Sequence, residues 1–180
     1  MRRRCLILEL TLLSLTAIAF AGCGNGSTDS TNPNVTPSLP SNEDKVTISQ
    51  GAWGNVWFWD GNFMPVAIPG IESSGGQITP VIREIHVHRP TTWTEMTNPT
   101  SNISGPFFLN IPSELIAIAS SDETGFYQID LPPGLYSVFV KEGTAFYANL
   151  FDSQGRINPV EVLPGTVTKL QLDITYKAAF

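Results

Sequence analysis

The sequence predicts an all-β fold, an antiparallel β-sandwich of about seven to eight strands with two long loop insertions. Short segments rich in aromatic and β-branched residues alternate with polar residues at a period of two, which is typical of strands with one buried face. Turn signals made of Gly, Pro, Asp and Asn separate these segments. Beyond residue 22, no amphipathic stretch is long enough to indicate a helix of useful length.

The stretch from Ser121 to Val140 shows the strand pattern twice. A turn at Asp122–Gly125 precedes the alternating segment Phe126–Leu131. Pro132-Pro133-Gly134 ends that segment, because proline removes a backbone donor and is excluded from central strands. Leu135–Val140 then reads as the next strand. Since the connection is too short for a crossover, we expect these two strands to pair antiparallel.

Other segments carry similar strand signals, and two long connections interrupt them. Strands are expected at residues 46–60, 81–88, 114–121, 145–151, 160–163 and 170–176. We expect Asp60-Gly61-Asn62 to form a hairpin-type turn after the first of them. The insertions are residues 66–80 and 89–113. The second is too apolar for plain disorder, so we expect it to pack across the sandwich, with a short strand or helical turn near Pro112–Leu115.

Two groups of residues resemble the carboxypeptidase regulatory-like domain. The first group runs from Asp122-Glu123-x-Gly125-Phe126-Tyr127 to Leu131-Pro132-Pro133-Gly134-x-Tyr136, and the second is Gly54-x-Val56, Asp60-Gly61 and Pro65. Together they frame residues 50–145. The resemblance implies a prealbumin-like (transthyretin-like) β-sandwich. Its register would point Val56 inward, and hence Trp57 and Trp59 outward.

Residues 1–22 have the pattern of an export signal. Arg2, Arg3 and Arg4 precede the apolar run Leu6–Phe20, which is short for a membrane span. Ala21-Gly22-Cys23 then resembles the lipobox of bacterial lipoproteins, with Phe20 where leucine is usual. The resemblance implies cleavage before Cys23 and a diacylglycerol thioether on its sulfur, with further acylation, such as palmitate, on the new amine. The alternative is an ordinary secretory signal followed by a chance cysteine.

The segment after the lipobox is expected to be a tether. Residues 24–45 are rich in Ser, Thr, Asn, Pro and Gly, so they can bury too little apolar surface to offset ordering entropy. Residues 23–45 are therefore predicted to be the lipidated cysteine and a disordered tether, and residues 46–180 a single domain. The expected location is the cell envelope, with the domain outside the cytoplasm and the lipid in the membrane, the outer one in a bacterium with two membranes.

Charge and motifs exclude several classes of function. With 10 basic and 16 acidic residues the chain has a net charge of −6, which disfavours nucleic acid as a partner. The sequence contains no Gly-x-Ser-x-Gly and no phosphate-binding loop, and both cysteines fall within the signal and the lipobox. We therefore predict a protein that is not an enzyme and needs no cofactor, acting as a lipid-anchored binding or scaffold module.

Three tryptophans are the candidate ligand residues. If Trp57, Trp59 and Trp93 are exposed, they can form an aromatic surface for a glycan or an envelope protein partner, as in a carbohydrate-binding module. The interpretation we favour for the two strand tryptophans is that the long loops cover them as a second small core.

A second candidate is a metal site on the expected strand 81–88. Glu84, His86 and His88 lie on one face at a spacing of two residues, which allows chelation of a metal ion. No cysteine or third histidine is available to complete a structural zinc site. The interpretation we favour is a pair of surface histidines, or histidines hydrogen-bonded to the following loop.

Overall fold

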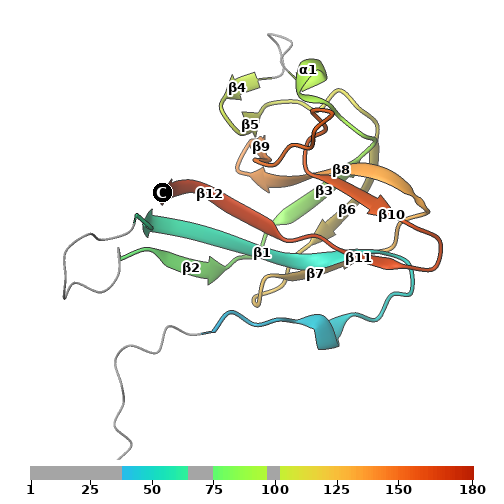
Figure 1. Ribbon diagram of the computed structural model, residues 1–180, viewed down its shortest axis with the longest axis horizontal. Coiled ribbons are helices and arrows are strands. Elements are labelled where there is room, and N and C mark those ends of the chain that lie inside the picture. Colours follow the sequence, from blue (N-terminus) through green and yellow to red (C-terminus); the bar gives the residue numbers. More distant parts are fainter. Residues whose placement is uncertain (1–37, 65–74, 97–101) are drawn as a thin grey trace, which may run out of the picture. The chain divides into compact units, whose positions relative to one another are not determined.

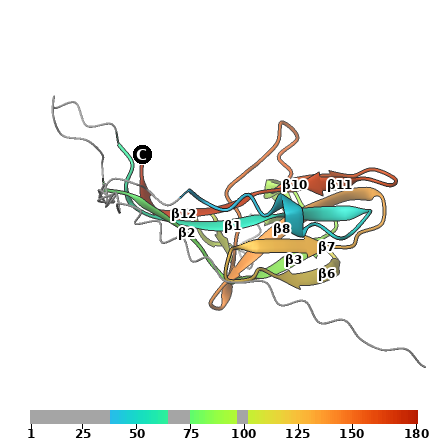
Figure 2. The same ribbon diagram turned by 90° about the horizontal axis from the view of Figure 1, so that it is seen from below.

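The computed structural model describes residues 38–64, 75–96 and 102–180, and it confirms an all-β sandwich of two sheets (Figures 1 and 2). All the described strands belong to one compact unit, Pro37–Phe180. The described helical elements are a 3-10 turn, η1 (Glu43–Lys45), and a one-turn helix, α1 (Trp93–Met96). No helix in the described part is long and apolar enough to cross a membrane. The predicted signal peptide and Cys23 lie outside the described residues.

The five-stranded sheet is organised around β1 (Gly51–Asn62). The first half of β1 pairs with β11 (Val167–Lys169) and β7 (Phe126–Ile129). Its second half pairs with β12 (Leu172–Ala179) and β2 (Gln77–Pro80). The pairs with β11 and β12 are parallel, so this sheet is mixed rather than antiparallel throughout as predicted. The reason is the path of the chain. It leaves β10 in the seven-stranded sheet and then runs through β11 and β12 in the same direction as β1, so both pairs are parallel.

The seven-stranded sheet is organised around β8 (Gly134–Glu142), and all its pairs are antiparallel. β3 (Glu84–His88) lies on one side of β8, followed by the edge strand β6 (Leu115–Ser120). The strands on the other side are β10 (Pro159–Val162), β9 (Ala145–Tyr147), β5 (Phe107–Phe108) and β4 (Asn102–Ser104). The predicted antiparallel pattern therefore holds in this sheet.

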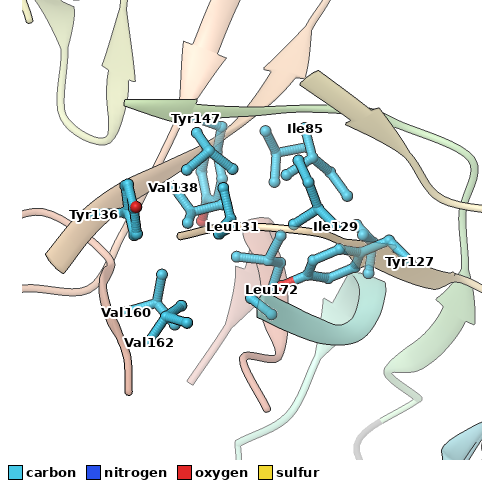
Figure 3. Packing of buried hydrophobic residues seen from close by; sticks show 14 of the residues in the cluster. Ile85, Tyr127, Ile129, Leu131, Tyr136, Val138, Tyr147, Val160, Val162 and Leu172 are labelled. Carbon is cyan, nitrogen blue, oxygen red and sulfur yellow. The ribbon is translucent and has the colours of Figure 1, made fainter. Parts of the chain in front are cut away.

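The main core lies between the two sheets. Val56 on β1, Ile85 on β3 and Ile174 on β12 have no exposed surface. Figure 3 shows the side chains of this core pointing toward one another from both sheets. Each fully buried side chain of this size contributes about 1.5–3 kcal/mol. The core therefore accounts for the attachment of one sheet to the other.

The two strands around Pro132-Pro133-Gly134 do not pair, contrary to the prediction. β7 belongs to the five-stranded sheet and β8 to the seven-stranded one. The connection is an arch, with Leu131 buried in the core and the Tyr136 hydroxyl donating to the Pro132 carbonyl at 2.8 Å. The prediction considered only two kinds of connection, a hairpin and a crossover, both between strands of one sheet. In a sandwich a short connection can also step from one sheet to the other, as it does again between β2 and β3.

The predicted turn at Asp60-Gly61-Asn62 is also wrong. These residues continue β1 and pair with residues 177–179 of β12, after a bulge between Phe58 and Asp60. Gly61 has a φ of 100°, which glycine adopts without strain. The connection to β2, residues 65–74, lies outside the described residues. The short strands β5 and β11 were missed because so short a run shows no alternation, whereas β9 forms only the first three residues of the expected strand 145–151.

The folded domain begins before residue 46, so the predicted end of the tether is too late. Asn42 is only 4% exposed, and its side-chain amide donates to Asn55 Oδ1 at 2.7 Å and to the Thr124 carbonyl at 3.1 Å. Lys45 Nζ lies 2.9 Å from Asp122 Oδ2. Desolvation would raise the pKa of Asp122, but hydrogen bonds from Lys45 and Thr124 outweigh it and lower the pKa to about 2.

Gly54 is predicted to be irreplaceable. A Cβ at this position would lie 1.8 Å from the Leu170 carbonyl oxygen and 3.2 Å from the Tyr127 ring, so Gly54→Ala must separate β1 from the chain between β11 and β12. We expect a loss of about 3 kcal/mol or more in the free energy of unfolding, measured by urea denaturation. The matched control is Gly143→Ala, whose Cβ would meet no atom within 4 Å and whose φ of 62° costs only about 1 kcal/mol. Equal losses for the two variants would contradict the prediction.

Candidate functional site

The tryptophans of β1 do not form an exposed surface. Trp57 lies on the face of β1 opposite Val56, as predicted, but it is only 3% exposed. Trp53, on the same face, is 6% exposed and has Lys169 Nζ 4.8 Å above its ring. Trp57 therefore offers almost no surface to a ligand, and the condition for an aromatic surface, exposure of this ring, is not met. The favoured interpretation, in which the strand tryptophans are covered, is confirmed as far as the burial of Trp57.

Trp59 is half-buried in a separate aromatic cluster. Its ring centroid lies 5.0 Å from that of Phe63 and 6.0 Å from that of Phe180. The indole Nε1 donates to Asp173 Oδ1 at 3.2 Å, which fixes the ring. Neither ring of this cluster belongs to the insertion that carries Trp93, so the structure does not bring the three predicted tryptophans together.

Trp93 is the exposed member of the predicted set. It is the first residue of α1 and is 38% exposed. Its ring packs edge-on against Phe151, with centroids 5.2 Å apart, and against Phe108 at 6.0 Å. Trp93, Phe151 and Gly155 line a hollow of about 360 Å³, which we call the Trp93 hollow. This volume is in the range of small-molecule pockets, about 300–1,000 Å³.

The Trp93 hollow lies next to a second hydrophobic core, because Trp93 packs against Phe108, a member of that core. The described parts of the insertion 89–113 extend the seven-stranded sheet through β4 and β5 and pack against β8, in line with the predicted packing across the sandwich, and α1, β4 and β5 lie together at the top of Figure 1. The buried residues of this core are Met96, Phe108, Ile111, Phe139, Ala148 and Ile157. Phe139 comes from β8, so the core fastens the insertion to the sheet. Of the short strand or helical turn expected near Pro112–Leu115, neither forms at residues 112–114; β6 begins at Leu115, and α1 forms earlier in the insertion.

Local hydrogen bonds hold Trp93 in place. Thr92 and Glu95 form a reciprocal cap, in which Thr92 N donates to Glu95 Oε2 at 2.7 Å and Glu95 N approaches Thr92 Oγ1 at 3.4 Å. Trp93 N also donates to the Gly155 carbonyl at 2.8 Å. These bonds join the insertion directly to the loop that forms the other wall of the hollow.

That other wall is the loop 151–157. Asp152 Oδ1 accepts hydrogen bonds from the backbone of Gln154 and Arg156, both at 2.9 Å, and Arg156 Nε lies 2.5 Å from Asp152 Oδ2. Gly155 has a φ of 72°, and no atom lies within 4 Å of the place its Cβ would occupy. The sequence did not indicate the role of this loop, because nothing local shows that it faces Trp93 some 60 residues away.

The chemistry of the hollow is apolar. Two aromatic rings and a glycine form its described lining, and the nearby carboxylate and guanidinium of Asp152 and Arg156 bind each other. An apolar ring or branched aliphatic group can therefore fill it by dispersion and loss of water. A sugar can stack on Trp93, but the described lining turns only apolar surface toward it.

The residues of the predicted metal site are on one face of β3 but do not converge. His86 Nε2 lies 2.5 Å from Glu84 Oε1, whereas His88 Nδ1 donates to the Ser113 carbonyl at 2.9 Å. The two imidazoles stack with centroids 6.2 Å apart, and both are buried. The described residues contain no group of three or more His, Cys, Asp or Glu that could hold a metal ion. The alternative of a histidine bonded to the following loop describes His88.

His88 connects the β3 face to the second core. Its ring packs edge-on against Phe139 at 5.6 Å, and Phe139 contacts Phe108 at 6.2 Å. Its Nε2 is buried without a hydrogen-bond partner among the described residues. Burial lowers the pKa of His88 from its ordinary value of 6.5, because the charged form would lose hydration.

Comparison with known proteins adds no relative, since no family model, curated protein or solved structure matches the chain. The resemblance to the carboxypeptidase regulatory-like domain therefore stays a prediction from the sequence.

The buried His88 predicts a loss of stability in acid. Because its folded pKa lies below its unfolded one, the unfolded chain binds more protons as the pH falls below about 6.5, and the free energy of unfolding falls by up to about 1.4 kcal/mol per pH unit. His88→Asn retains a donor for the Ser113 carbonyl but does not titrate. We expect the variant to lose this part of the pH dependence between pH 7.5 and 5.5 in urea denaturation. Identical pH slopes for the two proteins would contradict the prediction.

Proposed function

We propose that this protein is a non-catalytic, lipid-anchored binding module of the bacterial cell envelope, and that the Trp93 hollow is its ligand surface. The observation that carries the proposal is the hollow itself. Trp93 is 38% exposed there, although large aromatic side chains are normally stabilised by burial. Hydrogen bonds join the two segments that form the hollow, the insertion and the loop 151–157. A rigid, exposed aromatic ring beside a concavity is the arrangement that binding sites use.

The described lining supports a binding role rather than catalysis. Neither aromatic ring nor the glycine can serve as an acid, a base or a nucleophile. The ligand we propose is an apolar group, such as an aromatic or branched side chain of an envelope protein. A glycan is the second candidate, and it is favoured only by the exposed indole of Trp93, on which a sugar ring can stack.

The proposed anchor rests on Ala21-Gly22-Cys23 and on the distance to the domain. The chain from Cys23 to Ser38 spans at most about 50 Å when fully extended. A lipid on Cys23 would therefore keep the domain close to the membrane surface. Two or more acyl chains bind far more stably than one, at about 0.8 kcal/mol per buried methylene. A prealbumin-like sandwich, as the sequence motifs imply, would act as the rigid carrier of the hollow.

The binding proposal is tested with two probes, indole for an apolar ligand and N-acetylglucosamine trimer for a glycan. We expect indole to bind the unit Pro37–Phe180 and Trp93→Ala to weaken it about tenfold, measured by ligand-observed NMR, because the ring supplies one wall. Phe180→Ala is the control, since Phe180 is 67% exposed but belongs to the other aromatic cluster. Binding of the sugar alone would favour the second candidate. Binding of neither probe, or equal effects of the two variants, would refute the hollow as a site.

The anchor is tested separately on the full chain in a bacterial host. We expect Cys23→Ala to abolish incorporation of labelled palmitate and to release the protein from the membrane fraction, because the thioether cannot form. Cys5→Ala is the matched control and should retain both the label and the location. Labelling that survives Cys23→Ala would overturn the lipobox interpretation without affecting the hollow.

A further inference from the structure

β6 is an edge strand whose outer side has no backbone partner among the described residues. It pairs only with β3 and ends the seven-stranded sheet. Its sequence, Leu-Ile-Ala-Ile-Ala-Ser, contains no charged residue and no proline. Edges of this kind are templates for pairing with another strand, and natural proteins usually block them with charges, prolines or covering segments.

The register of the pairing between β3 and β6 shows which backbone groups of β6 point away from the sheet. Ser121 N donates to the Arg83 carbonyl at 3.0 Å, which makes this position a hydrogen-bonded pair. Such pairs alternate along an antiparallel ladder, so Ala119 and Ala117 also point their N–H and C=O groups at β3. The N–H and C=O groups of Ile118 and Ser120 therefore point away from the sheet. Two donors and two acceptors are available there to an incoming strand.

Other segments cover part of two edge strands of the five-stranded sheet, β12 and β7. On β12, Asn149 Nδ2 donates to the Asp173 carbonyl at 3.2 Å, and Thr175 N donates to the Tyr147 hydroxyl at 3.0 Å. Beside β7, the N-terminal segment binds through Thr47, whose backbone N donates to Gln128 Oε1 at 3.0 Å. In the part of the chain that the structure describes, no hydrogen bond engages the outward backbone groups of Ile118 or Ser120 on β6.

The side chains of β6 are also suited to pairing. Ile118 is 53% exposed and Leu115 is 44% exposed, so the edge is apolar as well as open. An ion pair stands at each end, with Arg89 Nε 3.1 Å from Glu114 Oε2 at the start and Lys45 Nζ 2.9 Å from Asp122 Oδ2 beyond the end. A highly charged strand would find no complementary charge along β6 itself.

We propose that β6 is where a second copy of this chain adds, by antiparallel pairing of the two β6 strands across a two-fold axis. The pairing is isologous, so the outward groups of each strand meet the same groups of its partner. Because Ile118 and Ser120 carry the outward groups, they pair with the same residues of the second copy and share one face of the joined sheet, while Ala117 and Ala119 of both copies share the other face. In this antiparallel pair, the start of one β6 lies beside the end of the other. The Arg89–Glu114 ion pair of one copy is thereby brought toward the Lys45–Asp122 ion pair of the other, so charges of both signs meet at each end. The two seven-stranded sheets become one continuous sheet.

The test is sedimentation equilibrium of the unit Pro37–Phe180, which contains both hydrophobic cores and so can fold alone. We expect a monomer–dimer equilibrium between about 10 μM and 1 mM, the range suited to a small interface. Ile118→Lys places a charge on the edge and should raise the dissociation constant at least about tenfold. Leu163→Lys is the matched control, because Leu163 is also 53% exposed but lies outside β6, and it should leave the equilibrium unchanged.

Amide hydrogen exchange gives a second readout that needs no substitution. The amides of Ile118 and Ser120 should exchange more slowly as the protein concentration rises, because pairing engages their outward N–H groups. A wild-type protein that remains monomeric at 1 mM, or whose Ile118 and Ser120 amides exchange at the same rate at every concentration, overturns the proposal. A folded Ile118→Lys variant whose dissociation constant equals that of the wild-type protein overturns it as well.

Discussion

The structure depends on the close approach of the chain at Leu170 to the backbone of β1. Leu170 N donates to the Trp53 carbonyl at 2.8 Å, and the Leu170 carbonyl accepts from the Tyr127 hydroxyl at 2.6 Å. Only a glycine at position 54 leaves room for this carbonyl. The contact lies where β11 gives way to β12, so it keeps both in line with β1. β11 and β12 form one side of β1, and β12 supplies Leu172 and Ile174 to the main core, so this contact helps to place both in the five-stranded sheet.

β3 and the middle of β8 are buried on both faces of the seven-stranded sheet, and this explains the features of β3. Ile85 and Val87 face the main core, whereas His86 and His88 face the layer formed by the insertion. Ring contacts run from His88 through Phe139 and Phe108 to Trp93. A charge on His88 would therefore enter the same aromatic layer that supports the hollow. The hollow is stable only while that layer stays packed, which links the candidate site to the neutral state of one histidine.

Features that depend on neighbouring residues, such as strand alternation and proline signals, were predicted correctly from the sequence. Features that depend on contacts between residues far apart in the chain, such as sheet membership and burial, were not. The alternation of β7 and the proline signal after it were found correctly, but the sheet to which each strand belongs depends on contacts far along the chain. The faces of β1 were assigned correctly, yet the burial of Trp57 could not be read from β1 alone. Asn42 looks like part of a polar tether, and only its bond to Asn55 shows that it belongs to the domain. Phe151 was placed at the end of a strand, because no local pattern pairs it with Trp93.

The strand order separates the two surfaces proposed for this protein. β6 ends one side of the seven-stranded sheet, whereas β5, whose Phe108 supports Trp93, lies toward the opposite end beyond β8 and β9. Pairing through β6 would thus leave the hollow of each copy open. A two-fold axis perpendicular to a continuous sheet keeps the outer faces of both copies on the same side, so the two hollows would face the same way. A ligand that presents two apolar groups, or a surface that presents many, would then be held by both at once, with an avidity that neither copy has alone.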